Sequence, residues 1–200
     1  MTRDAEQIVD LYDRHAAVWD QDRSKSLFEQ PWLDRFLALL PASGSILDIG
    51  CGSAEPIARY LIAAGYEVTG ADSSPAMIAL CKRRFPSHDW VVADMRSLSL
   101  DRRFDGILAW DSFFHLTCDD QRRMFAVFRA HAAPGAALMF TSGPRHGEAI
   151  GSYRGEPLYH ASLDEAGYRA LLGEFGFEVV AYVAEDPACG GHTIWLARLA

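Results

Sequence analysis

Cysteine and long apolar runs are scarce in this sequence. The four cysteines among the 200 residues lie far apart and form no Cys-x-x-Cys pair. We therefore expect reduced thiols in the core and no bound metal. No segment approaches the roughly 20 uninterrupted apolar residues of a membrane-spanning helix, and the opening residues, MTRDAEQIVD, do not resemble a signal peptide. These features predict a cytoplasmic protein that does not insert into a membrane.

Basic residues are also in short supply. The 19 Lys and Arg residues against 27 Asp and Glu residues give a formal net charge of −8, whereas binding to duplex nucleic acid needs a clustered basic face. The two short basic stretches, CKRRF and DQRRMF, fall on predicted helices, where a solvated outer face is their ordinary position. The sequence therefore disfavours nucleic acid as a partner.

Hydrophobic residues make up 50% of the chain, enough for one core of ordinary size. They fall into near-continuous apolar strands that alternate with amphipathic helices, which indicates a parallel sheet covered on both faces. The last two strand candidates, FEVVAYVAED and GHTIWLARL, are separated only by PACG. That connection is too short for a crossover, so the last strand must be antiparallel. We predict an α/β fold, a Rossmann-like three-layer sandwich with helices on both faces of seven strands, six of them parallel and the last reversed.

We expect a single domain with four parts. An N-terminal helical cap covers residues 1–42, a ligand-binding core covers 43–142, a loop covers 143–161, and a C-terminal helix with the antiparallel strand pair covers 162–200.

Several polar residues are predicted to cap helices. Ser74 can cap a helix that has Pro75 at its first position, and Thr117 can cap another. Ser162 and Glu165 have the spacing of a capping box for the C-terminal helix.

The segment LDIGCGSAEP (residues 47–56) joins an apolar strand to a predicted helix through Gly50 and Gly52. Glycines let the backbone turn tightly and approach a ligand, and the helix start offers unpaired N–H groups. Asp72 ends the next strand, where a carboxylate can accept both hydroxyls of a ribose. This pattern predicts a nucleotide, but nicotinamide enzymes carry the same acid.

Three features separate the candidate nucleotides. A dinucleotide fingerprint has a third glycine where this chain has Glu55, whose carboxylate would also repel a pyrophosphate. Asp48, at the end of the first strand, suits a ligand that carries an ammonium group. Asp94, in VVADM, is placed to accept a hydrogen bond from an exocyclic amine such as that of adenine. An ammonium, a ribose diol and an adenine amine together describe S-adenosylmethionine (SAM).

With these motifs the chain resembles the class I SAM-dependent methyltransferases, of the small single-domain kind that acts on metabolites. LDIGCGSAEP is similar to the first motif of that family, VTGADSSPAMI to the second and VVADM to the third. FDGILAWDSFFHL is similar to the strand-four segment that passes beneath the methionine part of the cofactor. The motifs that match the family lie within roughly residues 40–140. The chain departs from the pattern at Ala54, where many relatives have a further glycine, and we expect a slightly tighter pocket with binding retained.

The resemblance implies a set of residues that contact SAM. They are Asp48, Gly50, Cys51 and Gly52 at the methionine end, Asp72 with Ser73 or Met77 at the ribose, Asp94 and Met95 at adenine, and Trp110 or Asp111 near the amino-acid portion. In relatives an N-terminal helix closes over the cofactor. One of Tyr12 and Trp19, which share an apolar helix face, is therefore expected to contact SAM, with core packing as the alternative for both.

Methyl transfer from a sulfonium is an in-line displacement that needs alignment and exclusion of water, and a general base only where the acceptor must lose a proton. His115 is the candidate base because WDSFFHL leaves the sheet at its carboxyl edge. A histidine that caps or packs the next helix is an equal alternative. Asp111 and His192 are further candidates.

The predicted loop over residues 143–161 contains several glycines, and aromatic and histidine side chains lie on and near it. As a group they predict a lid over the acceptor, although loop packing is the alternative for each residue alone. The candidates for contact with the acceptor are Phe114, His115, His146, Tyr153, Tyr159 and His160.

The acceptor is expected to be a small molecule, with S-adenosylhomocysteine (SAH) as the other product. No DPPY or NPPY follows the fourth strand, and this signature is associated with amino-group methylation of bases and of glutamine. The acceptor atom stays open among oxygen, nitrogen, sulfur and carbon, and so does the oligomeric state. Two alternatives are a non-catalytic module that binds SAM or SAH and an NAD(P)-dependent oxidoreductase.

Overall fold

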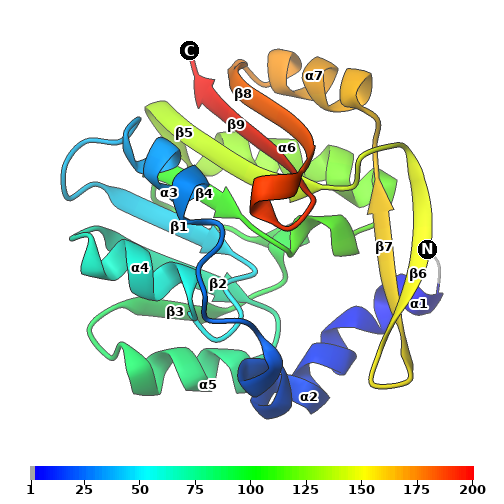
Figure 1. Cartoon of the computed structure of the whole chain (residues 1–200). Coiled ribbons are helices and arrows are strands. Elements are labelled where there is room, and N and C mark those ends of the chain that lie inside the picture. The colour runs from blue at the N-terminus through cyan, green and yellow to red at the C-terminus, as the bar shows by residue number, and fades with distance from the viewer. Residues whose placement is uncertain (1–2) are drawn as a thin grey trace.

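A seven-stranded sheet forms the centre of the computed structural model, which describes residues 3–200 (Figure 1). Its strand order is β3-β2-β1-β4-β5-β9-β8. The strands are β1 (Ser45–Ile49), β2 (Glu67–Asp72), β3 (Asp89–Val92), β4 (Phe104–Ala109), β5 (Ala132–Ser142), β8 (Phe177–Asp186) and β9 (His192–Leu199). Strand β9 is antiparallel to both of its neighbours, and the other pairs in the sheet are parallel. The prediction of six parallel strands and a reversed last strand is therefore confirmed.

Helices cover both faces of this sheet. Helices α3 (Gln30–Leu37), α4 (Ile57–Ala63) and α5 (Pro75–Arg84) pack their buried residues into one core cluster. Helices α6 (Cys118–His131) and α7 (Glu165–Glu174) pack into the other, with Phe125, Phe128 and Tyr168 against Phe140 of β5. The sheet and the helices on its two faces are thus the three layers of the Rossmann-like sandwich, with one core cluster between each pair of layers.

The N-terminal helices and a separate hairpin lie beyond one edge of the sheet. Helix α2 (Ile8–Asp22) passes beside α5, and both α1 (Arg3–Glu6) and α2 pass beside β7 (Glu156–Ser162), which forms the hairpin with β6 (Gly147–Tyr153) (Figure 1). Residues 1–2 of the predicted N-terminal cap lie outside the described residues.

The loop predicted over residues 143–161 is wrong for most of its length. Strands β6 and β7 pair as an antiparallel hairpin, and Arg154 and Gly155 form its turn with φ of 50° and 83°. The side chains of β6 are exposed or half-buried, so its sequence lacks the apolar alternation that marks a strand buried on one face. The glycine at the turn is the signal that indicates a hairpin.

Two of the three predicted caps are present. Ser74 Oγ accepts from the Met77 N–H at 3.1 Å, and Thr117 Oγ1 accepts from the Asp120 N–H at 3.2 Å. The predicted capping box at Ser162 is wrong, because β7 continues through Ser162 and helix α7 begins later. Asp164 caps it by accepting from the Gly167 N–H at 2.8 Å.

Candidate active site

One pocket opens at the carboxyl ends of the central parallel strands, beneath α2. All thirteen residues that the resemblance assigned to the cofactor line it, and so does His115. The thirteen are Tyr12, Trp19, Asp48, Gly50, Cys51, Gly52, Asp72, Ser73, Met77, Asp94, Met95, Trp110 and Asp111. The parallel sheet brings them together because β1, β2 and β4 end at the same edge.

The glycine loop is shaped by close contact with the segment after β4. Gly50 and Gly52 have φ of 77° and 53°, and a Cβ on Gly50 would lie 2.2 Å from Cβ of Ser112. The Ser112 hydroxyl donates to the carbonyl of Ile49 at 2.7 Å. Only glycine fits position 50, and the loop backbone is thereby exposed to the pocket.

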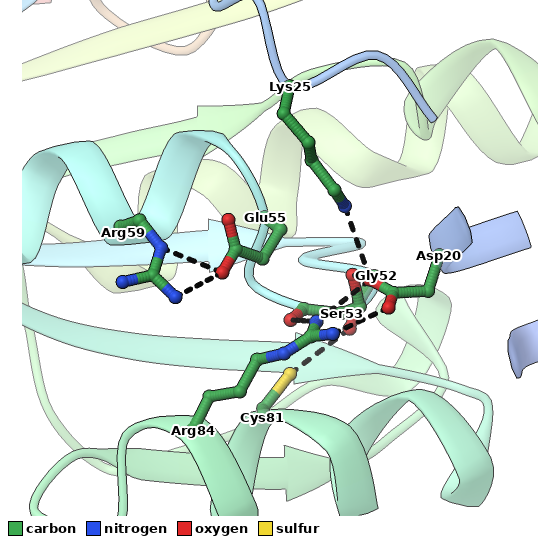
Figure 2. Close-up of polar contacts among 8 residues, drawn as sticks. All are labelled: Asp20, Lys25, Gly52, Ser53, Glu55, Arg59, Cys81 and Arg84. Carbon is green, nitrogen blue, oxygen red and sulfur yellow. Dashed lines mark hydrogen bonds and ion pairs between the residues drawn. The ribbon is translucent and has the colours of Figure 1, made fainter. Parts of the chain in front are cut away.

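The back of the loop is held by α5 and by the end of α2 (Figure 2). The Arg84 guanidinium donates to the Ser53 carbonyl at 2.9 Å, and the Cys81 thiol donates to the Gly52 carbonyl at 3.1 Å. Asp20 of α2 accepts from Arg84 at 2.5 Å and from the Ser53 hydroxyl at 2.5 Å. The Arg84 contact, foremost, holds the pKa of Asp20 well below its usual range. The N-terminal helix is thus attached directly to the glycine loop.

Asp72 is fixed by two backbone donors. Its two carboxylate oxygens accept from the N–H groups of Gly52 and Ser74, each at 2.9 Å. Burial raises the pKa of this carboxyl, and the two backbone hydrogen bonds oppose that effect. Each oxygen keeps lone-pair capacity for one hydroxyl of a diol.

Asp48 is an acid whose pKa is strongly raised by burial. It is 4% exposed, and burial, with a smaller contribution from the charge of Asp72, raises its pKa to about 7. A carboxylate in this state gains most from a cationic ligand, because the cation replaces the lost hydration and favours the ionised form.

Asp94 is oriented by its own chain segment. It accepts from the Arg96 N–H at 2.9 Å at the start of the short helix η1 (Met95–Ser97), and the Arg96 guanidinium pairs with it. That pairing lowers the pKa of Asp94. An adenine amine at this carboxylate would share it with Arg96.

Glu55 lines the pocket, but its charge is paired. Its Oε1 accepts from Nε of Arg59 at 2.7 Å (Figure 2). Repulsion of a pyrophosphate by Glu55 is therefore weaker than the sequence alone suggested.

His115 lies at the pocket wall with both ring nitrogens engaged. Its Nδ1 is 2.8 Å from the carbonyl oxygen of Tyr159, which can only accept, so Nδ1 carries the hydrogen. Its Nε2 then accepts from the Tyr12 hydroxyl at 2.9 Å. Burial lowers the pKa of His115 to about 4. In this arrangement His115 fixes Tyr12, and its basic nitrogen is occupied.

The remaining acceptor candidates do not line the pocket within the described part of the chain. The ring of His160 lies 4.8 Å from that of His115 and 5.2 Å from that of Phe114. The ring of Tyr153 packs 5.1 Å from that of Trp19 on α2. The Tyr159 side chain is buried in the hairpin core and His146 is exposed.

Sequence reasoning missed one group of contacts around Asp111. Its two carboxylate oxygens pair with His192 at 2.9 Å and with Arg23 at 3.3 Å. Arg23 also pairs with the buried Glu29 at 3.2 Å. His192 was named only as a possible base, and no local pattern connects it with Arg23.

Two kinds of feature are absent from residues 3–200. No helix in this range is long and apolar enough to cross a membrane. No group of three or more His, Cys, Asp or Glu side chains in it is arranged to hold a metal ion.

The fold and the pocket define a Rossmann-like domain with an acid at or near the end of each of its first three strands, and comparison with known proteins shows what it is similar to. Residues 46–135 match the family model described as a methyltransferase domain. The putative methyltransferase YqeM of Bacillus subtilis is 33% identical over 135 residues, 64% of this chain and 54% of that protein. A malonyl-[acyl-carrier protein] O-methyltransferase of Enterobacter lignolyticus is 33% identical over 166 residues, 76% of this chain and 64% of that protein.

Solved structures agree on the fold. SAM-bound CalS10, an amino pentose methyltransferase from Micromonospora echinaspora, superposes with a TM-score of 0.72 at 21% identity, covering 94% of this chain and 96% of that one. The chain is thus similar to methyltransferase domains over residues 46–135 and shares the fold of SAM-bound CalS10. It spans 54% to 64% of the length of the two curated relatives above.

Proposed function

We propose that this chain is a SAM-dependent methyltransferase that transfers the methyl group of SAM to a small molecule. The observation that carries this proposal is the convergence of Asp48, Asp72 and Asp94 on one pocket around the glycine loop. The three acids match an ammonium, a ribose diol and an adenine amine, one at each strand end. Bound SAM supplies an activated methyl group, and the residues of the chain hold and align it.

Two details of the pocket support a charged, amino-acid-like ligand end. The positive charge of Arg23 lowers the pKa of the Asp48 carboxyl, but burial raises it by more. Trp110 Nε1 is buried without a hydrogen-bond partner in the described part of the chain. A buried N–H of this kind costs free energy until a ligand accepts from it.

Thermal unfolding with added ligands tests the proposal. A ligand that binds only the folded state stabilises it by about 2.7 kcal/mol at 100 times its Kd. SAM and SAH should raise the unfolding temperature, and NADH should not. Asp72→Ala should weaken SAM binding by about 1–3 kcal/mol, the usual effect of stranding polar partners. Stabilisation by NADH alone would overturn the proposal.

The acceptor screen should cover both oxygen and nitrogen nucleophiles. The relatives and structural neighbours named above include an O-methyltransferase acting on malonyl-[acyl-carrier protein] and an amino pentose methyltransferase. A free carboxylic acid, the same acid on a carrier protein, and an amino sugar therefore form the first panel. Tight SAM binding with no turnover across a broad panel would instead favour a non-catalytic binding module.

We also propose an arrangement of parts and a location. Residues 1–42 cap the core at 43–142, the hairpin within 143–161 borders the acceptor, and 162–200 complete the sheet. Contacts between α2 and the hairpin support this division, since Tyr153 donates to Asp22 at 3.1 Å. The cytoplasm is the proposed location, supported by four free cysteines.

A further inference from the structure

The imidazole of His192 lies between two hydrogen-bond acceptors. Nδ1 is 2.7 Å from the carbonyl oxygen of Cys189, and Nε2 is 2.9 Å from Oδ1 of Asp111. A carbonyl oxygen and an ionised carboxylate have no hydrogen to donate, so both ring nitrogens must carry one. The geometry therefore requires an imidazolium as long as Asp111 is ionised.

Asp111 is held ionised by a second cation. Arg23 Nη1 lies 3.3 Å from Oδ2, on the carboxylate oxygen that His192 does not use. Burial opposes ionisation, but the hydrogen bond and charge of His192, together with Arg23, outweigh it and lower the pKa of Asp111.

The surroundings of His192 also favour its charged form. Its ring lies 5.6 Å from that of Trp110, nearly parallel to it at 28°, and 5.6 Å from that of Phe28. Aromatic faces stabilise a nearby cation. Besides Asp111, the charged group that acts on His192 is the buried Glu29 of the α3 start, itself paired with Arg23. The hydrogen bond to Asp111, foremost, raises the pKa of His192, while burial opposes the rise.

Asp111 occupies a strained position in the pocket. It follows β4 with φ of 50°, and its N–H donates to Oγ1 of Thr141 at 2.9 Å. Left-handed backbone is uncommon outside glycine, although Asp tolerates it better than most residues, and such strain persists where surrounding contacts fix it. His192 begins β9, directly after the turn formed by η3 (Pro187–Cys189) and two glycines. The last turn of the chain thus reaches a residue of the SAM pocket.

We propose that His192 is a positioning residue whose imidazolium fixes the Asp111 carboxylate at the amino-acid end of the bound cofactor. This inference rests on the proposed function. His192 acts through Asp111 and does not itself line the pocket.

The sign of the pH dependence follows from the raised pKa. The imidazolium is fully present below the ordinary histidine pKa of about 6.5 and is lost as pH rises through the higher value in the folded protein. Affinity for SAM should therefore contain an alkaline decline that depends on His192. The α-amino group of SAM also titrates, so the decline is assigned by comparing variants.

The first experiment needs no cofactor. NMR titration of the histidine rings in the ligand-free protein should show His192 still charged at pH 7. Asp111→Asn should lower the pKa of His192. A neutral His192 at pH 7, or a pKa unchanged by Asp111→Asn, would overturn the proposal without bearing on methyl transfer.

The second experiment measures SAM affinity by calorimetry from pH 6 to 9. His192→Gln should raise Kd about tenfold at pH 6, the order expected for losing a charge-assisted contact, and should flatten the His192-dependent part of the alkaline decline. The control His88→Gln, at a half-buried residue that directly precedes β3 and does not line the pocket, should match the native protein. If His192 acts through Asp111, His192→Gln in the Asp111→Asn background should add no further loss. Fully additive losses would contradict the proposal, whereas no binding of SAM to the native protein would instead refute the proposed function.

Discussion

The hydroxyl of Tyr12 lies 2.9 Å from Nε2 of His115, and this contact joins helix α2 to the short helix η2 (Phe113–His115) after β4. Because the other ring nitrogen donates to the Tyr159 carbonyl, Nε2 must accept from the hydroxyl. Burial raises the pKa of Tyr12 well above its usual range, so the phenol keeps its proton. Helix α2, η2 and β7 therefore meet through one histidine.

The first prediction separates a positioning role of His115 from a catalytic one. We expect Tyr12→Phe and His115→Ala to behave alike, each raising KM for SAM several-fold and changing kcat little, because both release α2 from the pocket. Steady-state kinetics over a range of SAM concentrations measures the split. A general base contributes about 10²–10⁴ to the rate. A loss of that size in His115→Ala, with Tyr12→Phe near the native kcat, would show that His115 is the base.

A second prediction concerns Asp48 and pH. A pKa of about 7 means that part of the population is protonated near neutrality. A cationic ligand binds the ionised form and lowers that pKa. Affinity for SAM should therefore fall as pH drops below 7, by up to about tenfold per unit, and SAM binding should release protons near pH 6.5. Calorimetry in two buffers of different ionisation enthalpy measures the protons.

Asp48→Asn is the matched variant for that prediction. It should bind SAM more weakly at pH 7.5, and its affinity for SAM should no longer fall as pH drops below 7. In the ligand-free protein the raised pKa of Asp48 contributes stability that is lost as pH rises through about 7, so Asp48→Asn should also narrow the stability difference between pH 5 and pH 8. Proton-independent binding by the native protein would show that Asp48 does not face the ammonium.

The sheet and the strand-end acids could be predicted because both depend on local sequence. Each apolar run predicts a strand, and the carboxyl ends of parallel strands lie at the same edge of a sheet. The sequence alone therefore predicted that Asp48, Asp72 and Asp94 lie close together. The antiparallel end of the sheet followed from the length of one connection. These inferences need no knowledge of packing between distant segments.

The contacts of Asp111 could not be predicted for the opposite reason. Its partners, Arg23 and His192, lie 88 and 81 positions away, and neither belongs to a recognisable pattern. The capping error at α7 has a different origin. Ser162 and Asp164 are both good caps, and the extent of β7, which depends on its pairing with β6, decides between them.

A third prediction tests the departure at Ala54. This residue has φ of 66° and is fully buried, and left-handed backbone costs a non-glycine residue roughly 1–2 kcal/mol. Ala54→Gly relieves that strain, but it also stabilises the unfolded chain by about 0.4–1 kcal/mol because glycine has more conformational freedom there. The net expectation is a gain of about 0.5–1 kcal/mol in the free energy of unfolding, measured by urea denaturation. The control Ala79→Gly, at an exposed position within α5, should lose about 1 kcal/mol. Loss of stability in Ala54→Gly would show that the packing of the Ala54 methyl group stabilises the fold by more than the backbone strain destabilises it.

The last prediction compares two ion pairs that Figure 2 shows side by side. In the Asp20–Arg84 pair the side chains are 13% and 26% exposed, and Arg84 also holds the glycine loop through the Ser53 carbonyl. In the Glu55–Arg59 pair Arg59 is 56% exposed and lies four positions after its partner, which precedes helix α4. Arg84→Met should therefore lower the free energy of unfolding by about 1.5–3 kcal/mol, the range of hydrogen bonds to charged groups. Arg59→Met should lower the free energy of unfolding by less than about 1 kcal/mol, as for exposed ion pairs in general.

The same two variants should differ in cofactor binding. Arg84→Met releases both the glycine loop and the end of α2, so its SAM affinity should fall several-fold, while Arg59→Met should stay near the native value. A double-mutant cycle between Asp20→Asn and Arg84→Met, measured by SAM titration, should show coupling because each substitution breaks the same attachment of α2 to the loop. Equal effects of Arg84→Met and Arg59→Met on binding would mean that the attachment stabilises the fold without shaping the pocket.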